Sequence, residues 1–209
     1  MTLTAQDRAR RIKVILFDVD GVLTNGGIWI IPVPVAGPNG TTTKMIEAKG
    51  YNAHDGAGVT LARLGGMKLG IITKRISETV ALRARDLKLE FVYQGQAFKM
   101  QAVREIMAKE GITLDEIAYV GDDVIDLPVM RVCGLAVAVQ NARAVVKAEA
   151  HYVTPNRGGE GAGRDAIEFI LDAKGLLKQC HEAMIDEGNS ALAAIDIGRG
   201  GDLADGETK

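Results

Sequence analysis

The stretch Val14-Ile15-Leu16-Phe17-Asp18-Val19-Asp20-Gly21-Val22-Leu23-Thr24 decides the fold. Its first four residues are apolar and strand-forming, and such an unbroken run is typical of a strand covered on both faces in a parallel sheet. Asp18 and Asp20 follow where the strand ends, at the edge where open α/β sheets bind ligands. Two carboxylates this close repel each other unless a cation lies between them, and Mg²⁺ prefers oxygen ligands. The stretch therefore predicts a parallel sheet with a metal site at its edge, although Asp is also common in turns.

The composition is that of an ordinary soluble globular protein. The chain has 209 residues, of which 47% are hydrophobic and 25% charged, enough for one core plus an appendage. A net charge of −2 gives no global field for nucleic acid or an anionic membrane, so we expect neither partner. Cys133 and Cys180 are too few for a disulfide framework and indicate reduced thiols. No apolar run approaches a membrane span and the N-terminus lacks a signal peptide's apolar core, so we expect a cytoplasmic protein.

Strand-like and helix-like segments alternate along most of the chain. Buried strands are expected at 14–17, 68–73, 90–94, 117–120, 135–139 and 152–154. Helices are expected up to residue 64 after a Gly-rich loop at 51–58, and at 77–87, 99–109, 127–132, 142–150 and 164–177. This spacing predicts βαβ units and an α/β fold with a doubly wound, Rossmann-like parallel sheet. We divide the chain into an arm at 1–11, a main domain at 12–178, and a tail at 179–209 that thins in apolar residues after Glu182 and adds no core.

A β-hairpin is expected at about 26–48, directly after the opening stretch. Residues 26–31 and 41–46 have the pattern of two strands, and Asn39-Gly40 is a turn signal. Pro32, Pro34 and Pro38 restrict ladder pairing, so the tip is predicted to be irregular. The hairpin carries Trp29 and several Ile residues, and a neighbouring subunit would cover that apolar surface.

Polar residues follow several predicted strands in chain order. They are Asp18 and Asp20, then Thr73, then Lys99, and then the cluster Asp122, Asp123 and Asp126. Because the carboxyl ends of parallel strands share one edge, we expect these groups to converge. Phosphoryl transfer through an aspartyl intermediate needs a carboxylate nucleophile, a metal, and a Lys and a hydroxyl that hold the phosphoryl oxygens. The sequence therefore predicts a phosphoryl-transfer site.

These motifs resemble the haloacid dehalogenase superfamily of phosphohydrolases. The superfamily pattern is Asp-x-Asp-Gly-x-x-Thr, a Thr or Ser after a strand, a Lys, and Gly-Asp-Asp-x-x-Asp. Residues 18–24, Thr73, Lys99 and residues 121–126 match it in that order.

The resemblance implies a role for each residue. Asp18 would be the nucleophile, and Asp20 would protonate the leaving oxygen and later activate water. Mg²⁺ would be held by Asp18, the Asp20 main-chain carbonyl and Asp122, with Asp123 or Asp126 supporting these ligands. Asp126 is also placed to cap the helix that starts at residue 127.

The same resemblance assigns the transferring phosphoryl group to Thr73 and Lys99, both counted as catalytic and substrate-binding. An acid group elsewhere on the substrate would need a further cation, for which Arg75 is the first candidate. Arg157 and Arg164 are weaker candidates, since most arginines are simply exposed.

Residues 12–178 more closely resemble the 3-deoxy-D-manno-octulosonate 8-phosphate (KDO 8-phosphate) phosphatases and related 9-carbon keto-sugar phosphate phosphatases. The resemblance is carried by residues 18–24, 55–58, 71–77, 93–95, 121–123, 126–130 and 158–162. It implies a capless phosphatase of lipopolysaccharide biosynthesis, acting on a phosphorylated sugar acid, in which a hairpin packs between subunits of a homotetramer. Independently, the interval between Asp20 and Thr73 has too little helical pattern for a large cap, so another surface must exclude water.

Three departures from the family pattern bear on the substrate. Lys74 replaces the usual Gly after Thr73, which adds charge and removes backbone freedom. His54 stands where Arg is usual and would weaken a carboxylate clamp. The Pro-rich insert enlarges the hairpin tip.

Other functions stay open. The enzyme could act on a 9-carbon keto-sugar acid 9-phosphate or on another small phosphomonoester. It could also be a phosphosugar mutase, and an inactive scaffold is a further hypothesis, against which the complete acidic set argues. A phospho-receiver signalling domain uses similar residues, but its phosphorylated Asp follows a later strand than its acidic pair, and it needs no Gly-Asp-Asp-x-x-Asp.

Overall fold

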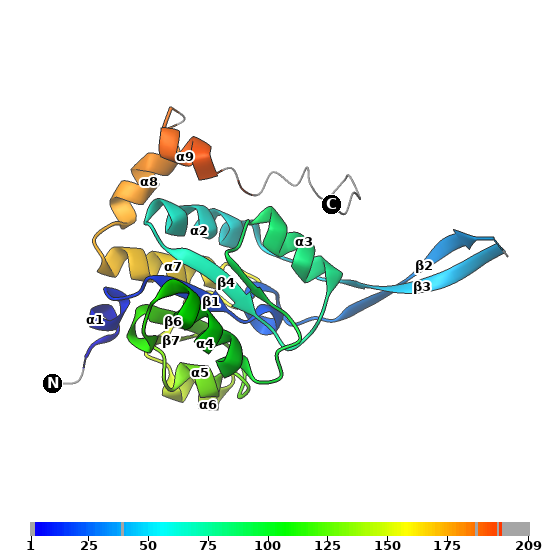
Figure 1. The fold of residues 1–209 in the computed structure, drawn as a ribbon, viewed down its shortest axis with the longest axis horizontal. Helices are drawn as coiled ribbons and strands as arrows, with labels where there is room; N and C mark the ends of the chain where they lie inside the picture. Colours follow the sequence, from blue (N-terminus) through cyan, green and yellow to red (C-terminus); the bar gives the residue numbers. More distant parts are fainter. Residues whose placement is uncertain (1–2, 39, 187, 196, 198–209) are drawn as a thin grey trace.

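A six-stranded parallel sheet forms the centre of the computed structural model, which describes residues 3–38, 40–186, 188–195 and 197 (Figure 1). Its strand order is β5-β4-β1-β6-β7-β8. The strands are β1 Val14–Phe17, β4 Lys68–Ile72, β5 Phe91–Tyr93, β6 Ile117–Gly121, β7 Leu135–Ala138 and β8 Tyr152–Val153. The doubly wound α/β fold expected from the alternating pattern is confirmed.

Helices cover both faces of this sheet. They are α1 Ala5–Ala9, α2 Ala53–Leu64, α3 Glu78–Asp86, α4 Lys99–Glu110, α5 Leu127–Met130, α6 Ala144–Glu149, α7 Ala162–Ala173, α8 Leu177–Ile185 and α9 Ser190–Ile195. Two short turns, η1 Val19–Leu23 and η2 Leu114–Glu116, precede other elements. Figure 1 places α2, α3 and α7 on one face and α4, α5 and α6 on the other. A parallel sheet needs this cover, since both of its faces are apolar.

Strand β1 lies in the middle of the sheet and positions the site. All four of its residues are buried, and Phe17 pairs with Ile71 of β4 on one side and Val120 of β6 on the other. The chain builds outward from β1 through β4 to β5 and then returns to β6 on the opposite side. Ligands bind at such a reversal, outside the carboxyl ends of the two central strands. Asp18 and Asp122 follow those two ends.

The hairpin projects from the carboxyl edge of the sheet as a long two-stranded ribbon (Figure 1). It consists of β2 Trp29–Gly37 and β3 Gly40–Ala48, paired from Trp29 opposite Ala48 to Gly37 opposite Gly40. The expected hairpin is present, but the predicted irregular tip is wrong, because the ladder continues through Pro32 and Pro34. A lone ribbon consists of two edge strands, where a proline's missing N–H can face away from the partner. Asn39 lies outside the described residues.

Several helix boundaries differ from the prediction, most clearly at the start of α2 and the end of α7. The Gly-rich loop expected at 51–58 is instead the start of α2, which begins after the N-cap Asn52, whose side chain accepts from the His54 N–H at 2.8 Å. Its glycines allow close packing of two helices, since a Cβ on Gly58 would lie 3.0 Å from the Cα of Arg164 in α7. Helix α7 ends at Ala173, before Gly175 with a φ of 72°.

The segment expected as a tail contributes helix α8, which packs against α2. Its Cys180 is buried in the core, so the boundary predicted after residue 178 falls inside a helix. The Gly- and Asp-rich residues 198–202 lie outside the described part of the chain. Cys133 and Cys180 are both free and buried. Among the described residues, no helix combines the length and apolar character needed to cross a membrane.

The loop between β8 and α7 locks the turn that follows β1. A Cβ on Gly158 would lie 1.7 Å from the carbonyl oxygen of Gly21, and the Gly159 N–H donates to the Val22 carbonyl at 3.0 Å. Only glycine fits where one backbone lies directly on another. This contact fixes the position of the turn that carries Asp18 and Asp20.

We predict that Gly158→Ala destabilises the fold by about 1–3 kcal/mol, because the added methyl group overpacks this contact. For a domain of this size the melting temperature should fall by about 3–10 °C in a thermal denaturation assay. Gly50→Ala is the matched control, since its Cβ would meet nothing within 4 Å. Equal melting temperatures for the two variants would show that the loop does not press on the turn.

Candidate active site

The turn after β1 carries Asp18 and Asp20, and its backbone is tightly folded. Gly21 has a φ of 91°, and a Cβ there would lie 2.2 Å from Oδ2 of Asp122. The Thr24 hydroxyl donates to the Val19 carbonyl at 3.2 Å and accepts from the Gly26 N–H at the same distance. The glycine therefore brings the motif against the Asp122 carboxylate, and the threonine closes the turn.

The ammonium group of Lys99 lies between carboxylates from two strand ends. Its Nζ is 2.8 Å from Oδ1 of Asp18 and 2.7 Å from Oδ1 of Asp126, and it donates to the Tyr119 hydroxyl at 2.9 Å. Lys99, Asp18 and Asp126 are 3%, 4% and 0% exposed. Charged groups this deeply buried need such partners, because removal from water is costly.

Asp126 organises the loop that follows β6. Its Oδ2 accepts from the backbone N–H groups of Asp122 at 3.0 Å and Asp123 at 3.2 Å, and its Oδ1 accepts from the Tyr119 hydroxyl at 2.9 Å. Its side chain makes no capping bond to α5, so the expected helix cap is not formed. Gly121 is required beneath it, because a Cβ there would lie 2.6 Å from the Asp126 Cβ.

Three carboxylates at this edge could hold a metal ion. Asp18, Asp122 and Asp126 each offer an oxygen within 4.8 Å of the others. Burial, followed by the charges of Asp126 and Asp18, raises the pKa of Asp122 to about 7. Burial raises the pKa of Asp18 to about 6, opposed by the nearby Lys99 and reinforced by Asp126. This oxygen donor set suits a hard divalent cation, which would relieve the repulsion.

Asp20 belongs to a separate ion-pair network that includes residues the sequence did not single out. Lys49 pairs with Asp20 and, at 2.7 Å, with Glu47, and the Lys49 side chain has no solvent exposure. Arg75 pairs with Glu47 at 2.8 Å and lies 3.8 Å from Asp20. Hydrogen bonds from Lys49 and Arg75 hold the pKa of Glu47 below its usual value. Arg75, predicted to bind substrate, is thus engaged by these carboxylates.

An open pocket of about 430 Å³ gives access to these groups. It is lined by Asp18, Asp20, Thr73, Lys74, Arg75, Asp122, Asp123 and Ile125. Thr73 is 2% exposed and directly follows β4. Lys99 and Asp126 do not line this pocket but join it through the ion pair of Lys99 with Asp18. The weaker candidates Arg157 and Arg164 do not line it, and Arg164 pairs with Glu168 instead.

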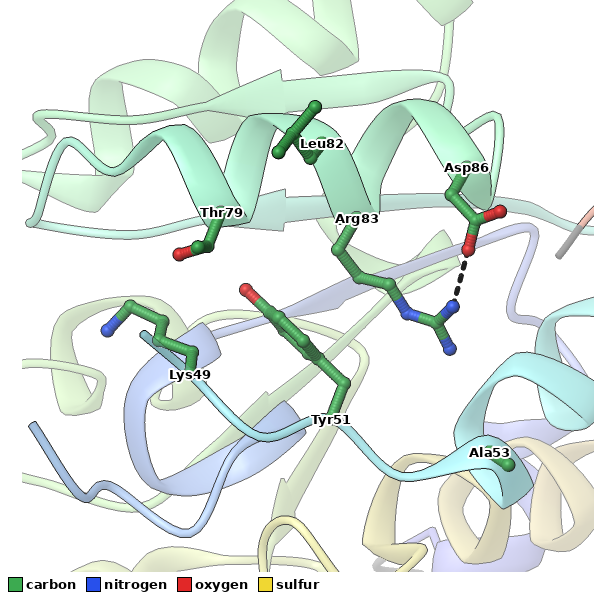
Figure 2. A pocket seen from close by; sticks show the side chains of 7 residues that line it. All are labelled: Lys49, Tyr51, Ala53, Thr79, Leu82, Arg83 and Asp86. Atoms are coloured by element: carbon green, nitrogen blue, oxygen red, sulfur yellow. Dashed lines mark hydrogen bonds and ion pairs between the residues drawn. The ribbon is translucent and has the colours of Figure 1, made fainter. Parts of the chain in front are cut away.

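A second pocket of about 440 Å³ adjoins this site through Lys49. Figure 2 shows Lys49 at one end and Arg83, with its ion pair to Asp86 at 2.5 Å, at the other. The Tyr51 ring lies between them, with the Arg83 guanidinium 5.9 Å from its centroid. The side chain of His54, near this pocket on α2, is exposed.

Sequence reasoning missed Lys49, Glu47 and Tyr119. Lys49 and Glu47 lie at the base of the hairpin, where charged residues are common on exposed strands and give no specific signal. Tyr119 lies in an apolar strand and gives no local signal of its hydroxyl's contacts. The contact appears only in the folded chain, where the Lys99 ammonium donates to this hydroxyl at 2.9 Å.

Comparison with known proteins agrees with this geometry. Residues 71–163 match the model of the haloacid dehalogenase-like hydrolases. The chain is 38% identical to the KDO 8-phosphate phosphatase KdsC of Escherichia coli K12 over 172 residues, which cover 82% of this chain and 86% of that relative. It belongs to the KDO 8-phosphate phosphatase family. Membership of this family makes the chain a phosphoric monoester hydrolase, as the motifs predicted.

Crystal structures of the family share this fold. The Yersinia pestis KDO 8-phosphate phosphatase superposes with a TM-score of 0.75 at 36% identity, covering 83% of this chain and 88% of that one. The Moraxella catarrhalis enzyme gives 0.75 at 33% identity, covering 86% and 97%. That structure is a complex with a magnesium ion, a phosphate ion and a KDO molecule.

We predict that Asp122→Asn stabilises the metal-free protein at pH 8. The native state retains protons on its carboxyls that the unfolded chain has released, so the free energy of unfolding falls as pH rises from about 4 to 7. Removing one carboxyl should raise the melting temperature at pH 8 by about 2–6 °C, and the gain should shrink toward pH 5. Mg²⁺ should stabilise the wild type but not the variant.

The control for this experiment is Asp115→Asn, which changes an exposed acid away from the site. It should leave both the pH dependence and the response to Mg²⁺ as in the wild type. A lower melting temperature for Asp122→Asn than for the wild type at pH 8 without metal would show that these carboxylates do not repel each other.

Proposed function

We propose that this protein is an Mg²⁺-dependent phosphomonoesterase that works through an aspartyl-phosphate intermediate. Its substrate is a 3-deoxy keto-sugar acid phosphate such as KDO 8-phosphate, which it cleaves to the free sugar acid and phosphate. The observation that carries this proposal is the Lys99 ammonium, 2.8 Å from Asp18 and 2.7 Å from Asp126 beside a pocket that opens to solvent.

In the first step, an Asp18 oxygen attacks the phosphorus atom. The new O–P bond forms as the bond between phosphorus and the sugar oxygen breaks, and Asp20 delivers a proton to that oxygen. Lys99 and the Thr73 hydroxyl hold the equatorial phosphoryl oxygens. Asp18, Asp122 and the Asp20 main-chain carbonyl would hold Mg²⁺, supported by Asp126 and Asp123, and a bound ion would offset the negative charge of the nucleophile and the phosphate.

In the second step, Asp20 takes a proton from water. The water oxygen bonds to phosphorus, the Asp18 O–P bond breaks, and phosphate leaves. Lys49 and Arg75 keep the Asp20 side chain at the pocket wall. Asp20 is therefore held beside the pocket that the leaving oxygen and the water must enter.

The names of similar enzymes support this substrate class. The departures from the family pattern leave the length of the sugar open. The similar enzymes of Escherichia coli and Moraxella catarrhalis are named for KDO 8-phosphate. A 9-carbon keto-sugar acid 9-phosphate is the second candidate, because His54 and Lys74 differ from the family pattern. A receiver domain does not fit, since Asp122 and Asp126 of the Gly-Asp-Asp-x-x-Asp motif join Asp18 in one cluster and the likeness to phosphatases covers most of the chain.

We also propose that the hairpin packs in a homotetramer within the cytoplasm. The ribbon exposes large apolar side chains, including Trp29 at 62%, Met45 at 63% and Ile30 at 56%. Apolar surface of this kind marks an interaction site. A neighbouring subunit seated there would also close the pocket, since the described residues between η1 and α2 form β2 and β3 and no helical cap.

We predict that Asp18→Asn abolishes turnover while the fold is retained. Losing the nucleophile should lower kcat about 10³-fold or more, measured by phosphate release with Mg²⁺ and KDO 8-phosphate. Circular dichroism checks the fold, and Asp115→Asn is the active control. Mass spectrometry of acid-quenched wild type should find phosphate on the peptide that contains Asp18. Substantial residual turnover would refute this nucleophile.

We predict a solution mass four times the chain mass of 22.2 kDa. Multi-angle light scattering at micromolar concentration measures it directly. Trp29→Glu should shift the protein toward smaller species, because a charge enters an apolar contact. Val145→Glu on α6, at a residue 48% exposed and away from the hairpin, is the control. A wild-type monomer would remove the shared-site proposal.

A further inference from the structure

Three cations around the active-site pocket are paired with carboxylates of the protein itself. Lys99 is paired with Asp18 and Asp126, and Lys49 with Asp20 and Glu47. Arg75 is paired with Glu47 at 2.8 Å. Each of these cations is therefore already balanced by a carboxylate of the protein before any substrate enters.

Lys74 is the exception. It lines the same pocket and its side chain is exposed. Within the described part of the chain, no carboxylate lies within ion-pair distance of it. It directly follows the buried Thr73, which also lines the pocket. The pocket therefore has an unbalanced positive charge one residue from the hydroxyl that is proposed to hold the phosphoryl group.

The rest of the pocket wall defines what this charge can bind. Asp20 and Asp123 line the wall and would repel an anionic substrate group. Ile125, 44% exposed, offers an apolar surface on the same wall. A substrate with phosphate at one end and a second anion at the other would meet one unpaired cation there, and that cation is Lys74.

We propose that Lys74 is a specificity-determining residue that binds a carboxylate of the substrate. This inference rests on the proposed phosphatase function and assigns to Lys74 the recognition earlier expected of Arg75. Glu47 occupies the Arg75 guanidinium, whereas the Lys74 ammonium is available. A point charge on a flexible stem suits a carboxylate whose distance from the phosphate varies.

The test compares substrates with and without a carboxylate. The kcat/KM values of wild type, Lys74→Ala and Lys74→Arg are measured with KDO 8-phosphate and with p-nitrophenyl phosphate. A second, matched pair is 6-phosphogluconate and sorbitol 6-phosphate, which differ only in a carboxylate against a hydroxymethyl group. For both pairs, the ratio of kcat/KM for the carboxylated substrate to that for its partner should fall about tenfold in Lys74→Ala, the range expected for one ion pair in a pocket.

Lys74→Arg should retain most of the ratio, and added salt should lower it in the wild type but not in Lys74→Ala. Lys178→Ala, at an exposed lysine on α8, is the matched control and should keep the wild-type ratio. An equal fall in kcat/KM for both members of a pair would mean that Lys74 binds the phosphate that they share, and unchanged kcat/KM values for both would mean that it binds neither group. Both results overturn the inference.

Failure of the proposed function would give a different assay result from failure of the role of Lys74. A wild type that hydrolyses none of the four phosphomonoesters with Mg²⁺ would overturn that function and the role of Lys74 with it. A wild type that cleaves p-nitrophenyl phosphate but not KDO 8-phosphate would refute the named substrate alone. The ratio for 6-phosphogluconate and sorbitol 6-phosphate then decides the role of Lys74, and a wild-type ratio near one overturns it.

Discussion

The buried ammonium of Lys99 lies among the carboxylates that follow β1 and β6. It contacts Asp18 at 2.8 Å and Asp126 at 2.7 Å, but Asp122 adds a third carboxylate to the same cluster. One lysine leaves this cluster with excess negative charge, and that excess is the attraction for a divalent cation. The order of β1 and β6 in the sheet, the glycines at 21 and 121, and the buried Tyr119 hydroxyl all serve this arrangement.

Much of the fold and part of the site follow from the sequence because local chemistry dominates there. Continuous apolar runs specify buried parallel strands, and polar residues at the ends of such strands must share an edge. Asp18, Thr73, Lys99 and Asp122 could therefore be grouped before any coordinates. Lys49 could not, because its role depends on how the base of the hairpin folds back over Asp20. That contact joins residues that no strand pattern relates.

The errors have physical causes of the same kind. Proline was expected to restrict strand pairing, but a two-stranded ribbon with no other strand beside it tolerates Pro32 and Pro34. Gly56 and Gly58 were interpreted as loop residues, but they lie in α2. Their lack of a side chain leaves room for the Arg83 side chain and for helix α7. Residues 179–209 were expected to form a tail without core residues, but Leu177, Cys180 and Met184 of α8 pack on the core. In each case tertiary packing outweighed local propensity.

The ribbon of β2 and β3 pairs only with itself and shares no strand with the main sheet. Insertions or deletions near its tip therefore change its reach without altering the register of β1, β4 or β6. The apolar surface that the ribbon exposes can consequently diversify separately from the residues at the strand ends. In evolutionary terms, a lineage can remodel a peripheral contact surface while the ancestral reaction centre is inherited intact.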